Sequence, residues 1–234
     1  MDRRTFVLAG PAVLLAGCVS VPGVAGPPAP APVFRVGDRW VYNCSDGFRV
    51  PVLWVETHEV TAIDAQGIDV RVTLRGDTMN YTRMERLLSP GVVSVGAVYD
   101  PAETRQFEAP LVRYQFPLTP GATWTQNLRN RDPSNQLVST INRFVRVGGY
   151  EKVTVPAGTF DAIVMRILMS VDDNNPFRWP TNANYVLWWS QKAGAMVRET
   201  RYATYRERGD GRDAANIRAQ NTTIELASYT RASA

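Results

Sequence analysis

From residue 34 onward, hydrophobic and polar residues alternate along much of the chain, and this period of two predicts β-strands. The clearest run extends from Ile68 to Leu74, where every second residue is apolar and the residues between are polar. Such an alternation places one face of a strand against a core and the other in water. The turn Asp64-Ala65-Gln66-Gly67 lies just before it and predicts a hairpin with the run from Val50 to Ile63.

The same criterion predicts further strands, most of them bounded by turns that contain Gly or Pro. Pro156-Ala157-Gly158 forms one predicted corner, and the stretch from Gln191 to Ala195 forms another. A short helix within Arg212 to Gln220 is the only helical element that we expect. The other predicted strands are Thr78–Leu88, Asn135–Val147, Tyr150–Val155, Phe160–Val171, Ala183–Ser190, Met196–Arg206 and Thr222–Tyr229.

Two segments about 84 residues apart resemble each other, namely Phe34-Arg35-Val36-Gly37-Asp38-Arg39-Trp40 and Leu118-Thr119-Pro120-Gly121-Ala122-Thr123-Trp124. Each has an apolar residue, a Gly turn and a Trp that opens a strand. The match suggests two related halves that share one core. We therefore predict an all-β (or β-rich α+β) fold, in which a large curved antiparallel sheet forms a half-barrel or sandwich. A single domain is expected over residues 34–230.

The N-terminal segment has a different pattern. Arg3 and Arg4 precede an apolar run from Phe6 to Ala16, and Leu15-Ala16-Gly17-Cys18 closes it. A basic head, an apolar stretch of about 7–15 residues and small residues before a cleavage point are typical of an export signal. The tetrapeptide resembles the lipobox of bacterial lipoproteins. The resemblance covers residues 1–18 and implies that residues 1–17 are a signal peptide and that Cys18 carries the lipid.

The flanking residues bear on export route and location. Asp2-Arg3-Arg4-Thr5-Phe6-Val7 is similar to a twin-arginine export motif, but two arginines also suit a general secretory signal, so both routes stay open. Val19 follows the Cys, where Gram-negative lipoproteins retained in the inner membrane tend to have Asp. The resemblance thus implies a lipid-anchored cell-envelope protein, expected at the outer membrane and facing the periplasm.

A proline-rich stretch connects this signal to the domain. Residues 19–33 contain five prolines, which exclude a helix or a central strand. Together with Cys18 they form a predicted tether over residues 18–33. In extended polyproline geometry, at about 3.1 Å per residue, such a spacer reaches roughly 45 Å. We expect it to hold the domain away from the lipid headgroups.

Charge and cysteine content narrow the function further. The formal net charge is +4, and arginines are interleaved with acidic residues, so nucleic-acid binding is not expected. With Cys18 acylated, Cys44 has no partner for an intrachain disulfide. Cys44 lies in the turn-like stretch from Asn43 to Gly47, which favours a small, partly buried thiol. A reactive thiol or an intermolecular disulfide is the alternative.

Residues that could carry chemistry are few. His58 is the only histidine, and Glu56 shares its strand face. The two could form a Glu–His pair or half of a metal site, although a solvated strand face is favoured. The run Asp172-Asp173-Asn174-Asn175 is oxygen-rich but lacks the Gly and distal Glu of a calcium loop, which favours a polar turn. No catalytic residue, metal or cofactor is predicted.

Aromatic side chains crowd one stretch of thirteen residues, and they form the candidate ligand groove. Trp188 and Trp189 are adjacent, so on a strand they point to opposite faces. The second Trp therefore lines a groove, as is usual for ligand sites, or is covered by the proline-containing loop as part of a satellite core. The candidate groove residues are Phe177, Trp179, Tyr185, Trp188 and Trp189.

A second resemblance covers residues 34–206. Val153-Thr154-Val155-Pro156-Ala157-Gly158-Thr159-Phe160, with the later Trp188-Trp189-Ser190 and Gly194-Ala195, is similar to a pattern in uncharacterised exported bacterial proteins. The fold of those proteins resembles the curved sheet of the lipoprotein carriers LolA and LolB. The resemblance implies a β-rich fold and carries over no catalytic residue.

Together, these features predict a non-catalytic, lipid-anchored envelope protein. Its partners would be the membrane, through the anchor, and an apolar or amphipathic ligand such as a lipid, or another envelope protein. One alternative is a structural or assembly lipoprotein without a small ligand. A carboxylate-based glycan hydrolase is the other.

Overall fold

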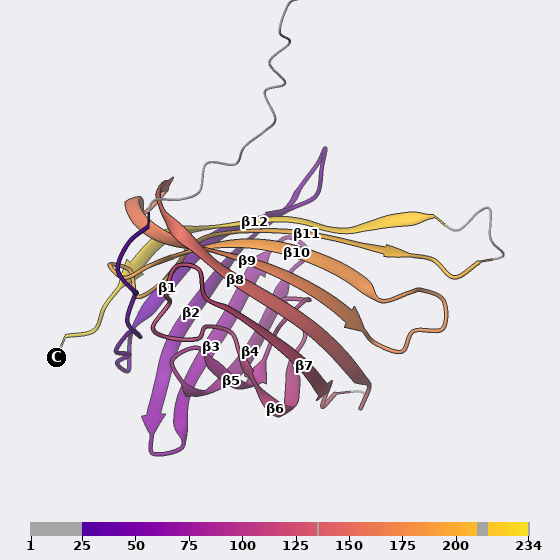
Figure 1. Ribbon diagram of the computed structural model, residues 1–234, viewed down its shortest axis with the longest axis horizontal. Helices are drawn as coiled ribbons and strands as arrows, with labels where there is room; N and C mark the ends of the chain where they lie inside the picture. The colour runs from indigo at the N-terminus through magenta and orange to yellow at the C-terminus, as the bar shows by residue number, and fades with distance from the viewer. Residues whose placement is uncertain (1–24, 135, 210–214, 234) are drawn as a thin grey trace, which may run out of the picture.

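A computed structural model describes residues 25–134, 136–209 and 215–233 of the protein. Within them the chain forms twelve strands, each antiparallel to the next, and the last pairs with the first to close a barrel (Figure 1). The all-β prediction is confirmed, with a closed barrel in place of a half-barrel or sandwich. The strands are β1 (Arg39–Asp46), β2 (Val52–Asp64), β3 (Gly67–Gly76), β4 (Asn80–Ser89), β5 (Val92–Gly96), β6 (Arg105–Val112), β7 (Thr123–Arg131), β8 (Val138–Val155), β9 (Gly158–Asp172), β10 (Thr181–Ser190), β11 (Ala195–Arg206) and β12 (Asn216–Thr230).

Most of the predicted strands are present. The β2–β3 hairpin turns at Asp64 to Gly67, and the two runs predicted from Asn135 to Val155 form the single bulged strand β8. The predicted helix within 212–220 is wrong where the structure describes it, because Asn216 to Gln220 belong to β12 and pair with β11. No helix of the described residues is long and apolar enough to cross a membrane.

Pairing between β1 and β12, from Arg39 with Thr230 to Asp46 with Thr222, closes the barrel. Closure gives every strand a neighbour on both sides. A barrel of this strand number is wide, and inward-facing apolar side chains from every strand fill most of the interior. Strands β8 to β12 extend beyond the others at one end (Figure 1).

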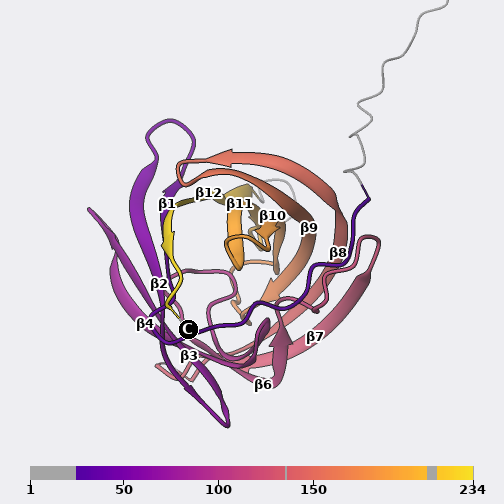
Figure 2. The ribbon, with the colours of Figure 1, turned by 90° about the vertical axis from the view of Figure 1, so that its left-hand side faces the viewer.

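The described N-terminal segment 25–38 runs across the mouth at the opposite end, which we call the tether end (Figure 2). Ala29 is buried and exchanges two backbone hydrogen bonds with Leu118, at 2.9 and 2.8 Å. The Tyr150 hydroxyl donates to the Pro27 carbonyl at 3.0 Å. Within the predicted semi-rigid spacer, the described residues 25–33 therefore include contacts with the rest of the domain, at Pro27 and Ala29. Proline-rich backbone still offers carbonyl acceptors, and Ala29 also donates its N–H to the Leu118 carbonyl.

The two repeat segments are built alike. Gly37 has φ of 92° and donates its N–H to the Val60 carbonyl, and Gly121 has φ of 88° and donates to Val147. Positive φ at both positions explains why glycine is needed. Each segment opens a set of six antiparallel strands, β1–β6 and β7–β12, which we call the first and second halves.

The halves meet at two places, the β1–β12 pairing and a weakly paired seam between β6 and β7. Only Gln106 with Arg131 and Phe107 with Asn130 pair across it. Further along, the side chain of Gln126 takes the place of backbone pairing. Its Oε1 accepts from Val112 N at 2.9 Å, and its Nε2 donates to the Pro110 carbonyl at 3.2 Å.

Candidate functional site

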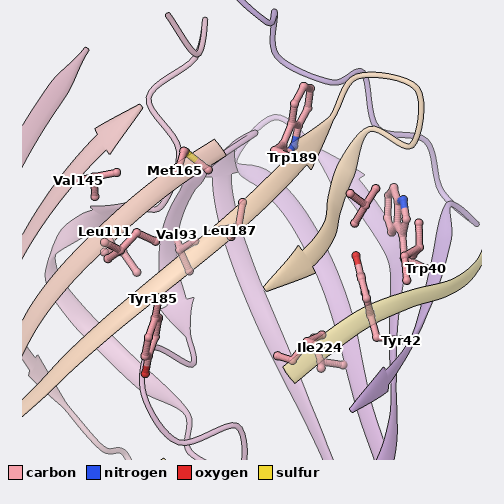
Figure 3. Close-up of a cluster of buried hydrophobic side chains, with 14 of the residues drawn as sticks. Trp40, Tyr42, Val93, Leu111, Val145, Met165, Tyr185, Leu187, Trp189 and Ile224 are labelled. Carbon is pink, nitrogen blue, oxygen red and sulfur yellow. The ribbon is translucent and has the colours of Figure 1, made fainter. Parts of the chain in front are cut away.

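The barrel interior contains a cavity of about 160 Å³, partly open to solvent, between the tether end and the middle of the strands. Its apolar wall comes from strands on opposite sides of the barrel, with Leu187 of β10 facing Val93 of β5 and Leu111 of β6 (Figure 3). Trp189 lines the cavity and contacts Phe116, another lining residue, at a centroid distance of 5.2 Å. This wall can hold an apolar group.

Charged side chains make up much of the rest of the lining. All but Arg113, which follows β6, lie on strands, two residues from a buried residue or from another member of the group, so the alternation of the strand turns them inward. We call them the interior charged cluster. Its members are Glu56, His58, Arg83, Glu85, Arg113, Arg143, Glu199 and Arg201.

Glu56 and His58 form a pair inside the barrel. His58 Nε2 lies 2.7 Å from Glu56 Oε1, and Arg83 Nη2 lies 3.4 Å from the same oxygen. Burial raises the pKa of Glu56, but the hydrogen bond and charge of His58 and the charge of Arg83 outweigh it and hold the pKa well below its usual range. The favoured interpretation of a solvated strand face is wrong, because this face of β2 points into the barrel.

Glu85 lies at the centre of the network. Its carboxylate pairs with Arg83 at 3.2 Å and with Arg113 at 2.9 Å. Burial raises the pKa of Glu85, but the charges of Arg113 and Arg83 lower it to about 2. Arg83 also donates to the Pro101 carbonyl at 2.5 Å, which fixes the network to the loop between β5 and β6.

Glu199 and Arg201 form a second pair on β11, at 2.8 Å. The Arg201 guanidinium also lies over the Tyr185 ring, 5.2 Å from its centroid. The Tyr185 hydroxyl in turn donates to Gln220 Oε1 at 2.9 Å. The Nε of Arg201 is buried and has no hydrogen-bond partner among the described residues.

Arg143 differs from the other arginines of the cluster. It is 4% exposed and donates to the backbone carbonyls of Val112 at 2.9 Å and Arg113 at 3.2 Å, across the β6–β7 seam. The ion pairs of the described cavity residues join Arg83, Arg113 and Arg201 to glutamates, and none includes Arg143. Burial and the charge of Arg113 lower the pKa of Arg143 to about 10.

The structure does not bring the five candidate groove residues together. Tyr185 and Trp189 line the cavity. Trp188 lies half-buried on the outer wall, where its Nε1 donates to Glu151 at 2.9 Å. Phe177 and Trp179, which are 78% and 53% exposed, lie at the far end in the β9–β10 connection. That connection lies at the opposite end of β10 from Trp188 and Trp189, so it forms no satellite core over them.

The remaining candidates have clear positions. Cys44 is buried in β1 rather than in a turn, and burial raises the pKa of its thiol. Asp172 accepts a hydrogen bond from the backbone of Asn174 in a polar turn. No group of three or more potential metal-ligating His, Cys, Asp or Glu side chains occurs in the part of the chain that the structure describes. The predicted signal peptide and Cys18 lie outside the described residues.

Sequence reasoning missed most of the charged cluster. Charged residues on strands usually face solvent, and this assumption excluded Glu85, Glu199 and Arg143 from the predicted site. These residues could have been found from the strand alternation, because residues an even number of positions apart on a strand share a face. Glu199 and Arg201 lie at the same alternation as Val197 and Ala203, two apolar residues that are fully buried in β11.

Comparison with known proteins gives structural neighbours only. No family model and no curated protein matches the chain. The structure resembles that of a candidate lipoprotein from Parabacteroides distasonis, with 12% identity, 86% of this chain and 97% of that chain covered, and a TM-score of 0.52. It also resembles a candidate exported protein with a YmcC-like fold from Bacteroides fragilis, with 14% identity, coverage of 87% and 99%, and a TM-score of 0.52.

At these identities the similarity establishes the fold alone. The neighbours are described by export or lipid attachment, and neither is described by an activity. The fold is therefore one found among candidate lipoproteins and exported proteins, in agreement with the class expected from the N-terminal sequence.

Proposed function

We propose that this protein is attached to the cell envelope through acyl chains on Cys18 and binds a small amphipathic molecule inside its barrel. The observation that carries the proposal is the cavity inside the barrel, which has an apolar wall on one side and charged side chains on the other. Ligand sites are typically apolar with a few placed polar groups. The lipobox and the description of the structural neighbours support the location.

The size of the cavity limits the ligand. A volume of about 160 Å³ is close to that of a protein cavity of about 150 Å³ that binds benzene. Pockets for drug-sized molecules are larger, at about 300–1,000 Å³. The ligand is therefore small, with roughly six to ten non-hydrogen atoms on this scale.

The charged cluster favours binding over hydrolysis. A glycosidase needs a carboxylic acid with a raised pKa as proton donor. Arginine and histidine neighbours lower the pKa of Glu56 and Glu85 instead. Burial raises the pKa of Glu103, but that residue pairs with Arg105 at 2.8 Å and does not line the cavity.

The binding proposal is tested on the full chain carrying Cys18→Ser, which cannot be acylated. Native mass spectrometry after incubation with hexanoate, 1-hexanol and hexylammonium should show an adduct of one molecule per chain. Val93→Phe fills the cavity and should abolish it. Val92→Phe, on the less buried face of β5, is the matched control and should retain it.

Two outcomes would overturn the binding proposal. If none of the three probes binds, the structural or assembly lipoprotein becomes the better interpretation. If Val93→Phe has a native circular dichroism spectrum and still binds, the ligand lies elsewhere. Attachment is tested separately, since Cys18→Ser should move the native protein from the membrane fraction to the soluble fraction.

A further inference from the structure

The charges that line the cavity do not balance. Four arginines face three glutamates, so the arginines of the lining exceed the glutamates by one. A buried charge without a counter-ion is costly unless other groups stabilise it. The small amphipathic ligand would therefore bind next to an arginine that has no glutamate partner.

The surplus can be assigned to Arg143. Arg83, Arg113 and Arg201 each pair with a glutamate, whereas Arg143 contacts only backbone carbonyls among its described hydrogen-bond partners. Burial and the charge of Arg113 lower the pKa of Arg143 more than the charges of Tyr114 and Glu199 raise it, so the network offsets this repulsion only in part.

A second, independent observation comes from Arg201. Five buried side-chain nitrogen or oxygen atoms lack a hydrogen-bond partner among the described residues, and Arg201 Nε is the one that belongs to a cavity-lining residue. Buried donors are normally satisfied, so the unpaired Nε of Arg201 is a donor that a bound acceptor could satisfy. An oxyanion would supply both the acceptor and the missing negative charge.

We propose that the cavity binds a short-chain monocarboxylate, with its carboxylate at Arg143 and Arg201 and its hydrocarbon chain against Val93, Leu111 and Leu187. This inference rests on the proposed binding function and specifies the ligand. One carboxylate matches one surplus charge, and guanidinium groups bind carboxylates well.

The probes separate this inference from the binding proposal. Titration calorimetry should show hexanoate binding to the Cys18→Ser chain about 10- to 100-fold more tightly than 1-hexanol, the range expected for a charged hydrogen bond. Hexylammonium should bind more weakly still, because its charge is repelled. If 1-hexanol or hexylammonium binds as tightly as hexanoate, this inference is wrong while the binding proposal stands. If no probe binds, both fail.

Variants at Arg143 locate the carboxylate. Arg143→Met should lose the preference for hexanoate but still bind 1-hexanol, and this retained binding reports an intact cavity. Arg143→Lys keeps the charge and should keep part of the preference. Arg146→Met removes an exposed arginine from the same strand and should change nothing. An unchanged preference in Arg143→Met would mean that Arg143 serves only to hold the β6–β7 seam, and would overturn the inference.

Discussion

The two halves of the barrel share their scaffold but not their interior charge. Both open with a Gly turn and a Trp, and each contributes six strands. The first half carries two glutamates and two arginines in one connected network, with His58 attached. The second half carries one glutamate and two arginines. The first-half residues are Glu56, Arg83, Glu85 and Arg113, and the second-half residues are Arg143, Glu199 and Arg201.

This difference separates two roles that buried charges can have. A balanced network within a barrel can fix side chains and hold its loops, as Arg83 does at the Pro101 carbonyl. Arg143 donates two hydrogen bonds at the β6–β7 seam but has no carboxylate partner in the described network, so we assign its charge to the ligand. The experiments below test whether the halves differ in stability as they do in charge.

The largest expected effect is from Glu85→Gln. It removes the carboxylate that neutralises Arg83 and Arg113, and breaking a buried ion pair costs about 3–5 kcal/mol. Glu199→Gln leaves only the partly exposed Arg201 unpaired and should cost less, about 1–3 kcal/mol. Urea unfolding followed by tryptophan fluorescence measures both. Equal losses for the two variants would contradict the assignment of the central network to the first half.

Lowering the pH should reduce the stability of the fold mainly through the charged network of the first half. The pKa of Glu85 is about 2 in the folded protein against an ordinary value of 4.5, so its ionised form stabilises the fold above about pH 4.5. That contribution is lost as the pH falls from 4.5 toward 2, and it amounts to about 3 kcal/mol. The wild-type protein should therefore lose more stability between pH 7 and pH 3 than Glu85→Gln does. Parallel losses in urea titrations at the two pH values would refute this.

The turns between the second and third strands of each half should differ by a smaller amount. Gly67 and Gly158 both have positive φ, of 147° and 124°. A Cβ at Gly67 would collide with the Leu87 carbonyl, whereas at Gly158 it meets nothing within 4 Å. Gly158→Ala should cost about 1 kcal/mol from backbone strain alone, and Gly67→Ala about 2–3 kcal/mol. Gly209→Ala, in open space, is the control, and thermal unfolding gives the order.

Local features of the fold were predictable and long-range ones were not. Alternation located β3, and Gly and Pro located the β2–β3 and β8–β9 turns. The short, bulged β5 has too few alternating residues for detection, and pairing with β11 makes Asn216 to Gln220 a strand despite their composition. Closure depends on β1 meeting β12 across the whole chain, which no local pattern encodes.

The candidate site was predictable only in part. The adjacency of Trp188 and Trp189 correctly implied opposite faces, and Trp189 does line the cavity. Nearness in sequence did not predict nearness in space. Phe177 and Trp179 precede β10 and Trp189 lies near its last residue, so the length of the strand separates them. The charged cluster joins residues from both halves, so its composition emerges only when the barrel closes.

Because residues 25–33 lie against the barrel, only a short segment remains between the domain and the predicted lipid attachment site at Cys18. Seven peptide steps separate Cys18 from Ala25, the first described residue, and they span at most about 25 Å. With acyl chains on Cys18, the mouth crossed by this segment stays next to the lipid surface. The opposite rim, with the exposed Phe177 and Trp179, then extends furthest into the surrounding compartment and is the first part that an approaching molecule meets.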